Sequence, residues 1–453
     1  MSKSLKWKWA AAIFLPLLIL LVPVSETFTG QMRLFFVITL IVIMIMAMEL
    51  APIIVPSLAF PLLYILFGLA EPKVAFSSWL SPSPWMTLAG LIMANILNST
   101  GLLKRGAYWG VMKSGATYKG ILYALMLAGI VFNLFVPGQA LIPMALLTYS
   151  ICQALDLKKS RASAGIMLAG FFAATIPMYF IYSSHFVMFQ SVGMTVTDVS
   201  IPWLEFIFQN LPLIPWAFIV IFMVSKLLKP EKEINGKTYF KEELKSMGPM
   251  TSREKKAILI CLALIALLVT NTVHHIQPAW ILMLFVCISF IPGIGIGDKE
   301  SLENVNYPFI FLVTGCMAIG EVSNSLGIGV WISNMLVPVM TNCGSTMMLV
   351  CAWLLAFVMN FILSPLAIAS TFTAPLTQLA LDLSINPLTF YYAMIQGADQ
   401  LLLPYEWPYF MVFFSFGLIS MKDFFKVYST KLIVSFLYFI AVMIPFWHLI
   451  HLL

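Results

Sequence analysis

The stretch Phe132-Asn-Leu-Phe-Val-Pro-Gly-Gln-Ala-Leu-Ile-Pro143 separates two apolar segments, about 120–136 and 140–155, by a proline, a glycine and an amide. A similar interruption, Asn360-Phe-Ile-Leu-Ser-Pro-Leu-Ala367, occurs 227 residues later. Helix breaks at corresponding places in two apolar halves are typical of the binding site of a membrane transporter built from inverted repeats. We therefore predict two re-entrant hairpins with tips that share one site near the bilayer midplane.

Composition assigns the chain to the membrane. It has 453 residues, of which 61% are hydrophobic and 10% are charged, whereas a soluble protein needs more charge to cover its surface. Apolar runs such as 10–24, 34–48 and 432–447 are long enough to cross or nearly cross a bilayer as helices. The net charge of +6 is carried mainly by short loops, so it indicates orientation in the membrane and not nucleic-acid binding.

The fold class that we predict is an all-α polytopic membrane protein with about eleven transmembrane helices and two re-entrant hairpins in two inverted repeats. We expect an N-terminal helix in 1–32, a first repeat in 33–227, a charged cytoplasmic linker in 228–256 and a second repeat in 257–453. Proline-containing breaks at 176–180 and 404–408 interrupt the expected fifth and tenth spans. The ninth span is expected over 307–337 and the eleventh over 430–450.

Basic residues support this topology. With the N-terminus in the cytoplasm and both hairpins re-entrant, all lysines and arginines except Arg33 and Lys73 fall on the cytoplasmic side. Such a bias is the usual signal of orientation in a cell membrane. It also leads to the expectation that the expected spans contain no lysine or arginine in their interiors.

The repeat is visible in the residues themselves. Trp85–Gly101 resembles Phe311–Gly327 at an offset of 226, and both segments end in Asn-Ser-x-Gly. The same offset, within one residue, relates Pro137 to Ser364 and Pro177 to Pro404. A common offset at three places favours duplication over coincidence.

These segments, together with 60–68 and 417–426 and the order of spans, resemble the divalent anion–sodium symporter family of dicarboxylate, citrate and sulfate carriers. The resemblance implies an elevator-like movement of the hairpin domain, sodium as a coupling ion and a homodimer. The family's Ser-Asn-Thr signature is replaced by Pro137-Gly138-Gln139 at the first tip and by Ser364-Pro365-Leu366 at the second. The frame of the family is therefore kept while the chemistry of the site differs.

An anion in such a site is expected to be held by half-helix N-termini, which carry partial positive charge and unpaired N–H groups. Gln139, Ser364, Ser370, Thr371, Tyr179 and Tyr405 are the side chains best placed to help. The substrate-binding residues that we predict are Pro137, Gly138, Gln139, Tyr179, Ser364, Pro365 and Tyr405.

Acidic residues within membrane spans are functional candidates by default. We predict that Glu406 and Asp399 couple transport to a cation. Glu321 is open between a structural and a functional role, and Glu49 is expected at a solvated corner. His185 is expected to be a satisfied helix residue, and Asn95, Asn98 and Asn324 are expected to make interhelical hydrogen bonds.

The function that we predict is secondary active transport of a small organic anion, most plausibly a di- or tricarboxylate, coupled to Na⁺ or H⁺ or working by exchange. The partners expected are this anionic solute and the lipid bilayer, with no cofactor beyond a coupling Na⁺. The alternatives are an anion exchanger, a channel-like permease for another small solute, or a membrane-embedded enzyme. The sequence lacks a His-rich metal set, a protease residue pair or a nucleotide loop, which argues against the enzyme.

Overall fold

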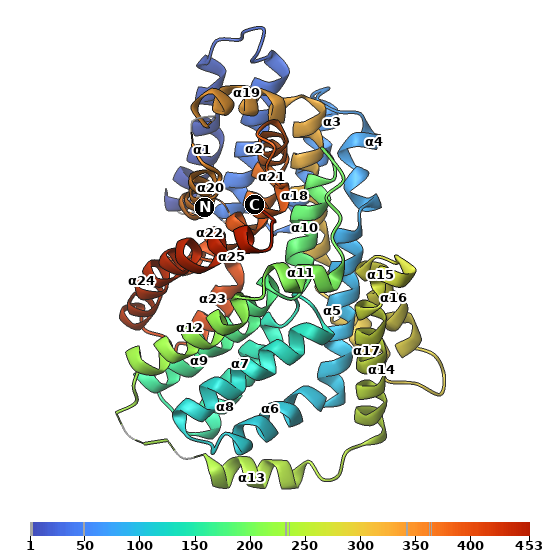
Figure 1. The fold of residues 1–453 in the computed structure, drawn as a ribbon, viewed down its shortest axis with the longest axis vertical. Helices are drawn as coiled ribbons and strands as arrows, with labels where there is room; N and C mark the ends of the chain where they lie inside the picture. The colour runs from blue at the N-terminus through green and yellow to red at the C-terminus, as the bar shows by residue number, and fades with distance from the viewer. Residues whose placement is uncertain are drawn as a thin grey trace.

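The computed structural model describes residues 3–48, 50–231, 233–234, 236–340, 343–361, 363 and 365–453. Within these ranges the regular elements are all helical (Figure 1). Four helical stretches are long and apolar enough to cross a membrane, namely Tyr118–Phe135, Arg161–Gly193, Lys299–Ser325 and Met421–Leu449, and two bent helix pairs qualify if each pair is one span. The predicted class of polytopic helical membrane protein is confirmed, whereas the number of about eleven spans stays a prediction.

The first hairpin forms where the sequence predicts it. Helix α7 (Tyr118–Phe135) follows Thr117, whose side chain caps it by accepting a hydrogen bond from the Gly120 amide. The chain then turns, with Gly138 in the left-handed region at φ +87°, and continues as α8 (Leu141–Ala154). Only glycine adopts this conformation at no steric cost, which explains the Pro-Gly break.

The second hairpin consists of α20 (Ser345–Met359) and α21 (Pro365–Asp382). Its tip lies between them, and the predicted site residue Ser364 falls outside the described residues. Pro365 opens α21, a position where its missing N–H costs nothing.

Both predicted broken spans are present. The first consists of α9 (Arg161–Thr175), the 3₁₀ turn η3 (Ile176–Tyr179) and α10 (Ser184–Gly193). The second consists of α22 (Pro387–Ala398), the 3₁₀ turn η4 (Pro404–Glu406) and α23 (Pro408–Ser415). Because proline lacks an amide hydrogen, it stops a helix from continuing, so each break follows from the sequence.

A framework of longer helices stands beside the hairpins. Helix α5 (Pro82–Thr100) bends by 66° into α6 (Leu102–Lys113) at Gly101, whose φ is +78°. Its repeat counterpart α18 (Tyr307–Ser325) ends before Gly327, at φ +72°, and α19 (Ile328–Met340) follows. The expectation of one span over 307–337 is therefore wrong, because the glycine of the repeated Asn-Ser-x-Gly motif breaks the helix in both halves.

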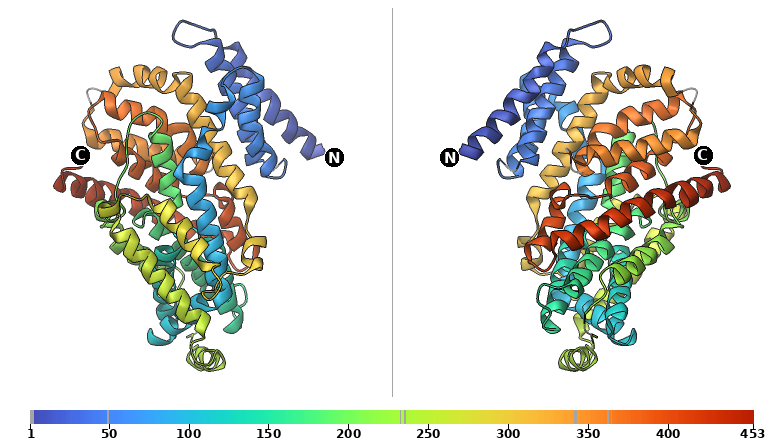
Figure 2. Two further views of the ribbon diagram at one scale, coloured as in Figure 1. Left: turned by 90° about the vertical axis from the view of Figure 1, so that its right-hand side faces the viewer. Right: turned by 90° about the vertical axis from the view of Figure 1, so that its left-hand side faces the viewer.

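The remaining helices complete the framework and connect the halves. Figure 2 shows that the N-terminal helices stand to one side of the molecule, against α18. The further elements are α1 (Lys3–Leu17), α2 (Gly30–Ala47), α3 (Ile54–Leu66), α4 (Pro72–Ala75), α11 (Trp203–Gln209), α12 (Leu213–Leu227), α13 (Lys237–Ser246), α14 (Ser252–Val269), α15 (Asn271–His274), α16 (Pro278–Ser289), α17 (Lys299–Glu303), α24 (Met421–Tyr438), a π-helical turn (Phe439–Met443) and α25 (Ile444–Leu449).

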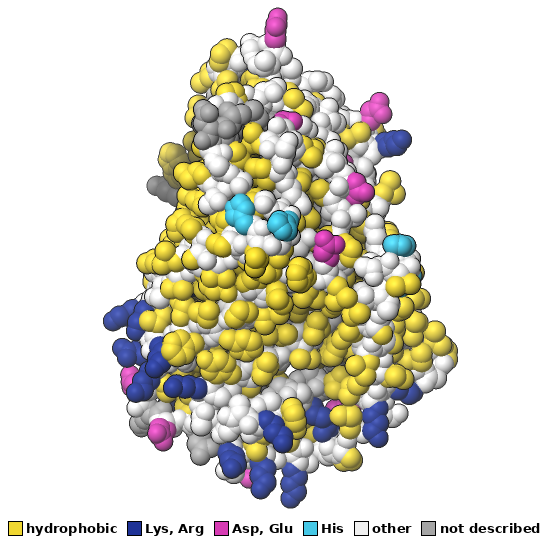
Figure 3. Space-filling model, viewed as in Figure 1, with side chains coloured by type: hydrophobic (Ala, Val, Ile, Leu, Met, Phe, Trp, Pro, Cys, Tyr) yellow, Lys and Arg dark blue, Asp and Glu magenta, His cyan; other side chains and the backbone are white. Residues whose placement is uncertain are grey.

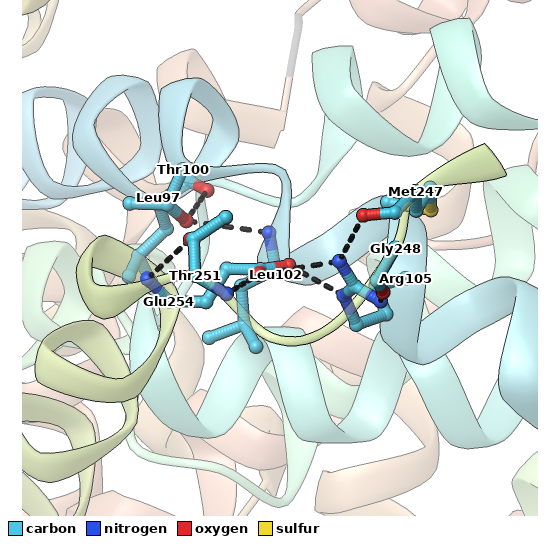
Figure 4. Close-up of polar contacts among 8 residues, drawn as sticks. All are labelled: Leu97, Thr100, Leu102, Arg105, Met247, Gly248, Thr251 and Glu254. Atoms are coloured by element: carbon cyan, nitrogen blue, oxygen red, sulfur yellow. Dashed lines mark hydrogen bonds and ion pairs between the residues drawn. The ribbon is translucent and has the colours of Figure 1, made fainter. Parts of the chain in front are cut away.

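An arginine joins the end of the linker between the halves to the first half (Figure 4). Arg105 of α6 donates to Glu254 Oε1 at 2.6 Å, to the Gly248 carbonyl at 2.8 Å and to the Met247 carbonyl at 3.0 Å. Burial raises the pKa of Glu254, but hydrogen bonds from Arg105 and Thr251 outweigh this effect and hold the pKa below its ordinary value. The carboxylate therefore stays ionised and fixes the start of α14 to α6.

The surface shows the division expected of a membrane protein. In Figure 3 a broad hydrophobic region covers the middle of the visible face, and lysines and arginines gather toward the lower end. Figure 1 places α6 and the linker helix α13 at that end. This basic end is the one predicted to face the cytoplasm.

The two hairpins pack through glycines, and this arrangement yields a first prediction. A Cβ on Gly129 of α7 would overlap the Ala173 carbonyl of α9, and a Cβ on Gly397 of α22 would overlap the Trp353 carbonyl of α20. Gly129→Ala and Gly397→Ala are each expected to destabilise the protein by about 1–3 kcal/mol, because the obstacle is rigid backbone. The measurement is the melting temperature of the purified protein in detergent.

Gly106→Ala is the matched control. Gly106 lies in α6 with no atom within 4 Å of an added Cβ, and alanine is favoured over glycine inside a helix. Its melting temperature should hold or rise. Equal melting of Gly397→Ala and Gly106→Ala would contradict the packing argument.

Candidate functional site

The structure brings the two hairpin tips to one cavity of about 250 Å³. Gly138 and Gln139 line it from the first tip, and Pro365 and Leu366 line it from the second. Further walls come from the start of α10, from Trp407 in the second broken span and from the framework helices α5 and α18. The shared location of the tips agrees with the sequence-based expectation, while their role in binding and their depth in the bilayer stay predictions.

One asparagine fixes the first tip. The Gly138 amide donates to Asn133 Oδ1 at 3.1 Å, and Asn133 Nδ2 donates to the Ala174 carbonyl of α9 at 3.2 Å. A further bond joins Asn133 Nδ2 to the Gly129 carbonyl at 2.9 Å. Asn133 is fully buried, so it ties the turn of the hairpin to the end of α9, where the first broken span is interrupted.

Gln139 presents the polar group of this tip. Its Nε2 donates to Ser184 Oγ at 3.3 Å, at the start of α10. The stem of the side chain lies against Gly90 of α5, where an added Cβ would come within 2.8 Å of Gln139 Cγ. We call the two hairpins and the two broken spans together the hairpin body. Gln139 therefore stands between the hairpin body and the framework, with its amide at the cavity.

The second tip has the same frame but different groups. Asn360 occupies the repeat position of Asn133 and donates from Nδ2 to Glu406 Oε2 at 3.3 Å. Pro365 occupies the position of Gly138 and has no N–H to donate. Accordingly, Asn360 Oδ1 has no hydrogen-bond partner in the described part of the chain. Leu366 replaces Gln139, so the second tip offers apolar surface where the first offers an amide.

Three helices begin at the cavity. The lining includes Leu141 and Ile142 of α8, Ser184 and His185 of α10, and Pro365 of α21. Each helix N-terminus carries roughly half a positive charge and N–H groups without a helical partner. Among the described lining residues there is no Lys, Arg, Asp or Glu. The site therefore favours an anion through helix ends and amides, without a fixed ionic side chain.

A smaller cavity of about 160 Å³ continues the site toward the basic end. It shares Asn98, Pro143 and Leu146 with the first cavity and reaches Lys104.

Asn95 also lines the main cavity and donates to the Ser301 carbonyl at 3.1 Å. Of the expected interhelical asparagines, Asn324 makes such a bond to the Thr195 carbonyl at 2.7 Å.

Glu406 lies beside the cavity but is not part of its lining. Its side chain is only 3% exposed and accepts hydrogen bonds from the Leu403 amide at 2.8 Å and the Leu402 amide at 3.1 Å. The carboxylate thus satisfies amides that the broken helix leaves free. Tyr405 lies in the same turn η4, and its side chain falls outside the described part of the structure.

Asp399 belongs to a separate buried group. Tyr179 Oη donates to Asp399 Oδ1 at 2.6 Å, and Lys431 Nζ of α24 forms an ion pair with Oδ2. The expectation that no lysine lies inside a span is therefore wrong. Helix α24 begins at Met421, nine residues before the expected start, and this places Lys431 about 15 Å along the helix. Tyr179 is engaged with Asp399 and does not line the main cavity.

Other candidates fall in different places. His185 lines the cavity, where its ring centroid is 6.3 Å from that of Trp407, so it is a site residue that the sequence reading treated as structural. Ser370 donates within α21 to the Ala367 carbonyl at 3.0 Å, and Thr371 Oγ1 has no partner in the described ranges. Glu49 is outside the described residues. Among the residues that the structure describes, no group of three or more His, Cys, Asp or Glu is arranged to hold a metal ion.

Comparison with known proteins gives three matches. The family model described as the sodium:sulfate symporter transmembrane region matches residues 3–453. A protein of Cupriavidus necator named "Membrane protein" is 25% identical over 362 residues, which cover 74% of this chain and 70% of that protein. The crystal structure of the Alcanivorax borkumensis YdaH transporter has a TM-score of 0.57 at 14% identity and covers 85% of this chain and 89% of that one. At this identity the last likeness concerns the fold.

The Asn133 anchor supplies a second prediction. Asn133→Ala leaves the Gly138 amide and the Ala174 carbonyl without this partner, so we expect a loss of about 1–3 kcal/mol of stability. Melting temperature measures the loss, and limited proteolysis at the first tip tests its position. Asn210→Ala is the control, because Asn210, the residue after α11, is equally buried, donates to the Phe206 carbonyl one turn back and does not line the cavity. An unchanged proteolysis pattern in Asn133→Ala would refute the anchoring role.

Proposed function

Because the chain belongs to the sodium:sulfate symporter family and is a secondary membrane transporter of anions, we propose that its cargo is a small organic anion, with di- and tricarboxylates preferred. Membership of a transporter family also makes it a carrier and not an enzyme. One observation carries the proposal about cargo. Three helix N-termini open into a cavity between the two hairpin tips, and helix N-termini bind carboxylates, phosphates and sulfate readily.

The lining assigns parts to individual groups. A carboxylate of the cargo accepts hydrogen bonds from the first-turn amides of α8 and α10 and from the Gln139 amide. Ser184 positions Gln139 through its hydroxyl. The apolar side chains Met188, Leu366 and Val313 line other parts of the cavity and contact the carbon skeleton of an organic anion, which sulfate lacks.

The packing supports a proposal about movement between the membrane faces. Helix α10 packs on α5 and α18, and α21 packs on α18 and α19. Gly320 of α18 brings the Ser370 carbonyl within 3.1 Å of where a Cβ would stand, so the two bodies approach closely through small residues. We propose that the hairpin body slides along this framework as an elevator, in the manner of shear motions between packed helices.

Orientation and assembly complete the proposal. The smaller cavity connects the site to Lys104 at the basic end, which we assign to the cytoplasmic side of the cell membrane. The described state is therefore open toward the cytoplasm. A homodimer and a cytoplasmic N-terminus are the arrangement that we expect.

Coupling concerns the carboxylates Glu406 and Asp399. An ionised Glu406 beside the cavity repels an anionic cargo, and burying an unpaired charge costs several kcal/mol. Protonation of Glu406 removes the repulsion, whereas a bound Na⁺ screens it. We favour protonation over Na⁺, because the groups that contact Glu406, namely the Leu402 and Leu403 amides and Asn360 Nδ2, are N–H donors, whereas transporters hold Na⁺ with carbonyl oxygens.

Uptake into proteoliposomes tests the cargo. We expect saturable uptake and counterflow of radiolabelled succinate or citrate, with the KM of Gln139→Ala raised about tenfold or more, because hydrogen bonds to charged groups are worth about 1.5–3 kcal/mol. Gln153→Ala, an exposed amide on the same hairpin, is the matched control and should behave as wild type. A flux that neither saturates nor shows trans-stimulation would indicate a channel, and competition by sulfate alone would exclude an organic cargo.

The pH profile tests the role of Glu406. If protonation accompanies binding, uptake in the wild type rises as the external pH falls, since a larger fraction of Glu406 is then neutral. Glu406→Gln mimics the neutral group, so its uptake should lose this pH dependence. Glu321→Gln, which changes a half-buried acid on the framework helix α18, is the control and should keep it. If Glu406→Gln keeps both the uptake rate and the pH profile of the wild type, the carboxylate only caps the broken helix and the proposed coupling is wrong.

A further inference from the structure

A lysine is buried inside the transmembrane helix α24. The side chain of Lys431 is 0% exposed and that of its partner Asp399 is 5% exposed. A charged side chain in the interior of a membrane protein is costly and is retained where it has a function. The mechanism proposed above leaves this lysine without a function.

The surroundings of Lys431 Nζ are those of a bound cation. Beside the Asp399 carboxylate, the ammonium donates to the Asp399 carbonyl at 3.0 Å and to Gln400 Oε1 at 3.2 Å. The rings of Tyr428 and Phe172 lie 5.6 and 5.7 Å from it, within the range of cation–π attraction. A carboxylate, a main-chain carbonyl and an amide oxygen thus converge on one positive charge.

The cluster of Lys431, Asp399 and Gln400 lies at a place in the fold where transporters bind cations. Asp399 directly follows α22, where the second broken span unwinds, so its carbonyl lies at a half-helix C-terminus. Transporters hold coupling Na⁺ with unwound carbonyls and half-helix C-terminal ends of this kind. From the first broken span, Tyr179 donates to the other Asp399 oxygen, so the cluster also joins the two breaks.

We propose that Lys431 is a tethered cation, whose ammonium occupies the place that an exchangeable coupling cation would take at the second break. This inference rests on the proposed function and restricts its coupling: the second break needs no free sodium, because the chain carries its own positive charge there. Asp399 is then a permanent partner of Lys431 and not a site of cation exchange.

A merely structural ion pair makes a different prediction. Removing the lysine of a structural pair destabilises the protein to the same extent in every salt. Removing a tethered cation leaves three oxygen ligands around a space that a small cation can enter. The response to the identity of the cation therefore separates the two roles.

The test compares melting temperatures of the full-length protein in sodium, methylammonium and choline chloride at equal concentration, without substrate. Wild type should melt alike in all three. Lys431→Ala should melt lower in choline and regain about 3 °C or more, saturably, in sodium or methylammonium, as expected for a ligand that binds the folded state alone. Lys431→Met/Asp399→Asn lacks the carboxylate and should show no such recovery.

Lys426→Ala is the matched control, because Lys426 is an exposed lysine of the same helix that donates to the Leu227 carbonyl. It should respond to the three salts as wild type does. Equal melting of Lys431→Ala in all three salts overturns the proposal, and so does its failure to fold in any of them, since a cation that fills the space restores the fold. No organic anion is present in this test, so failed uptake together with the expected melting pattern would refute the cargo proposal alone.

Discussion

Backbone groups released by broken helices must find partners inside the protein, because the bilayer core offers no water to hydrogen-bond them. The described site is organised around this constraint. At the tip of the first hairpin, Asn133 accepts from the Gly138 amide and donates to the Ala174 carbonyl. At the interruption of the second broken span, Glu406 accepts from the Leu402 and Leu403 amides. A break can stay open only where side chains replace the helical bonds, so these residues hold the chain in its broken form beside the cavity.

The same constraint explains how much the sequence could predict. Proline and glycine act on the residues next to them, so both hairpins and both broken spans were visible at 137–138, 177, 365 and 404. The bend at Gly327 was also readable from the repeated Asn-Ser-x-Gly motif, but the apolar run that continues beyond it concealed the break. The sequence could not predict the ion pair Asp399–Lys431, because 32 residues separate its members and only the packing of the helices shows which buried acid meets which base.

The two halves share a frame and differ in chemistry. Gly138 and Gln139 correspond to Pro365 and Leu366, and Tyr179 corresponds to Glu406. Geometry is preserved because glycine packing and proline breaks set it, as at Gly129 and Gly397. The side chains at the tips take no part in this glycine packing, so they can differ between the halves. The first tip therefore forms a polar side of the cavity and the second tip an apolar side. For the proposed organic anion, such a cavity offers different surroundings to the two ends of the molecule, which a symmetric site cannot do.

Charge then limits what the hairpin body can carry. Of three buried ionisable groups near the second break, Asp399 and Lys431 cancel each other, which leaves Glu406. Each elementary charge moved across 100 mV is worth about 2.3 kcal/mol, so a body that moves with Glu406 ionised works with or against the membrane potential on every cycle. With Glu406 protonated, the buried groups sum to zero and the charge that crosses is that of the cargo. In the proposed mechanism, the internal lysine therefore does for Asp399 what a coupling ion does elsewhere, and the cargo and one carboxyl group set the voltage dependence of transport.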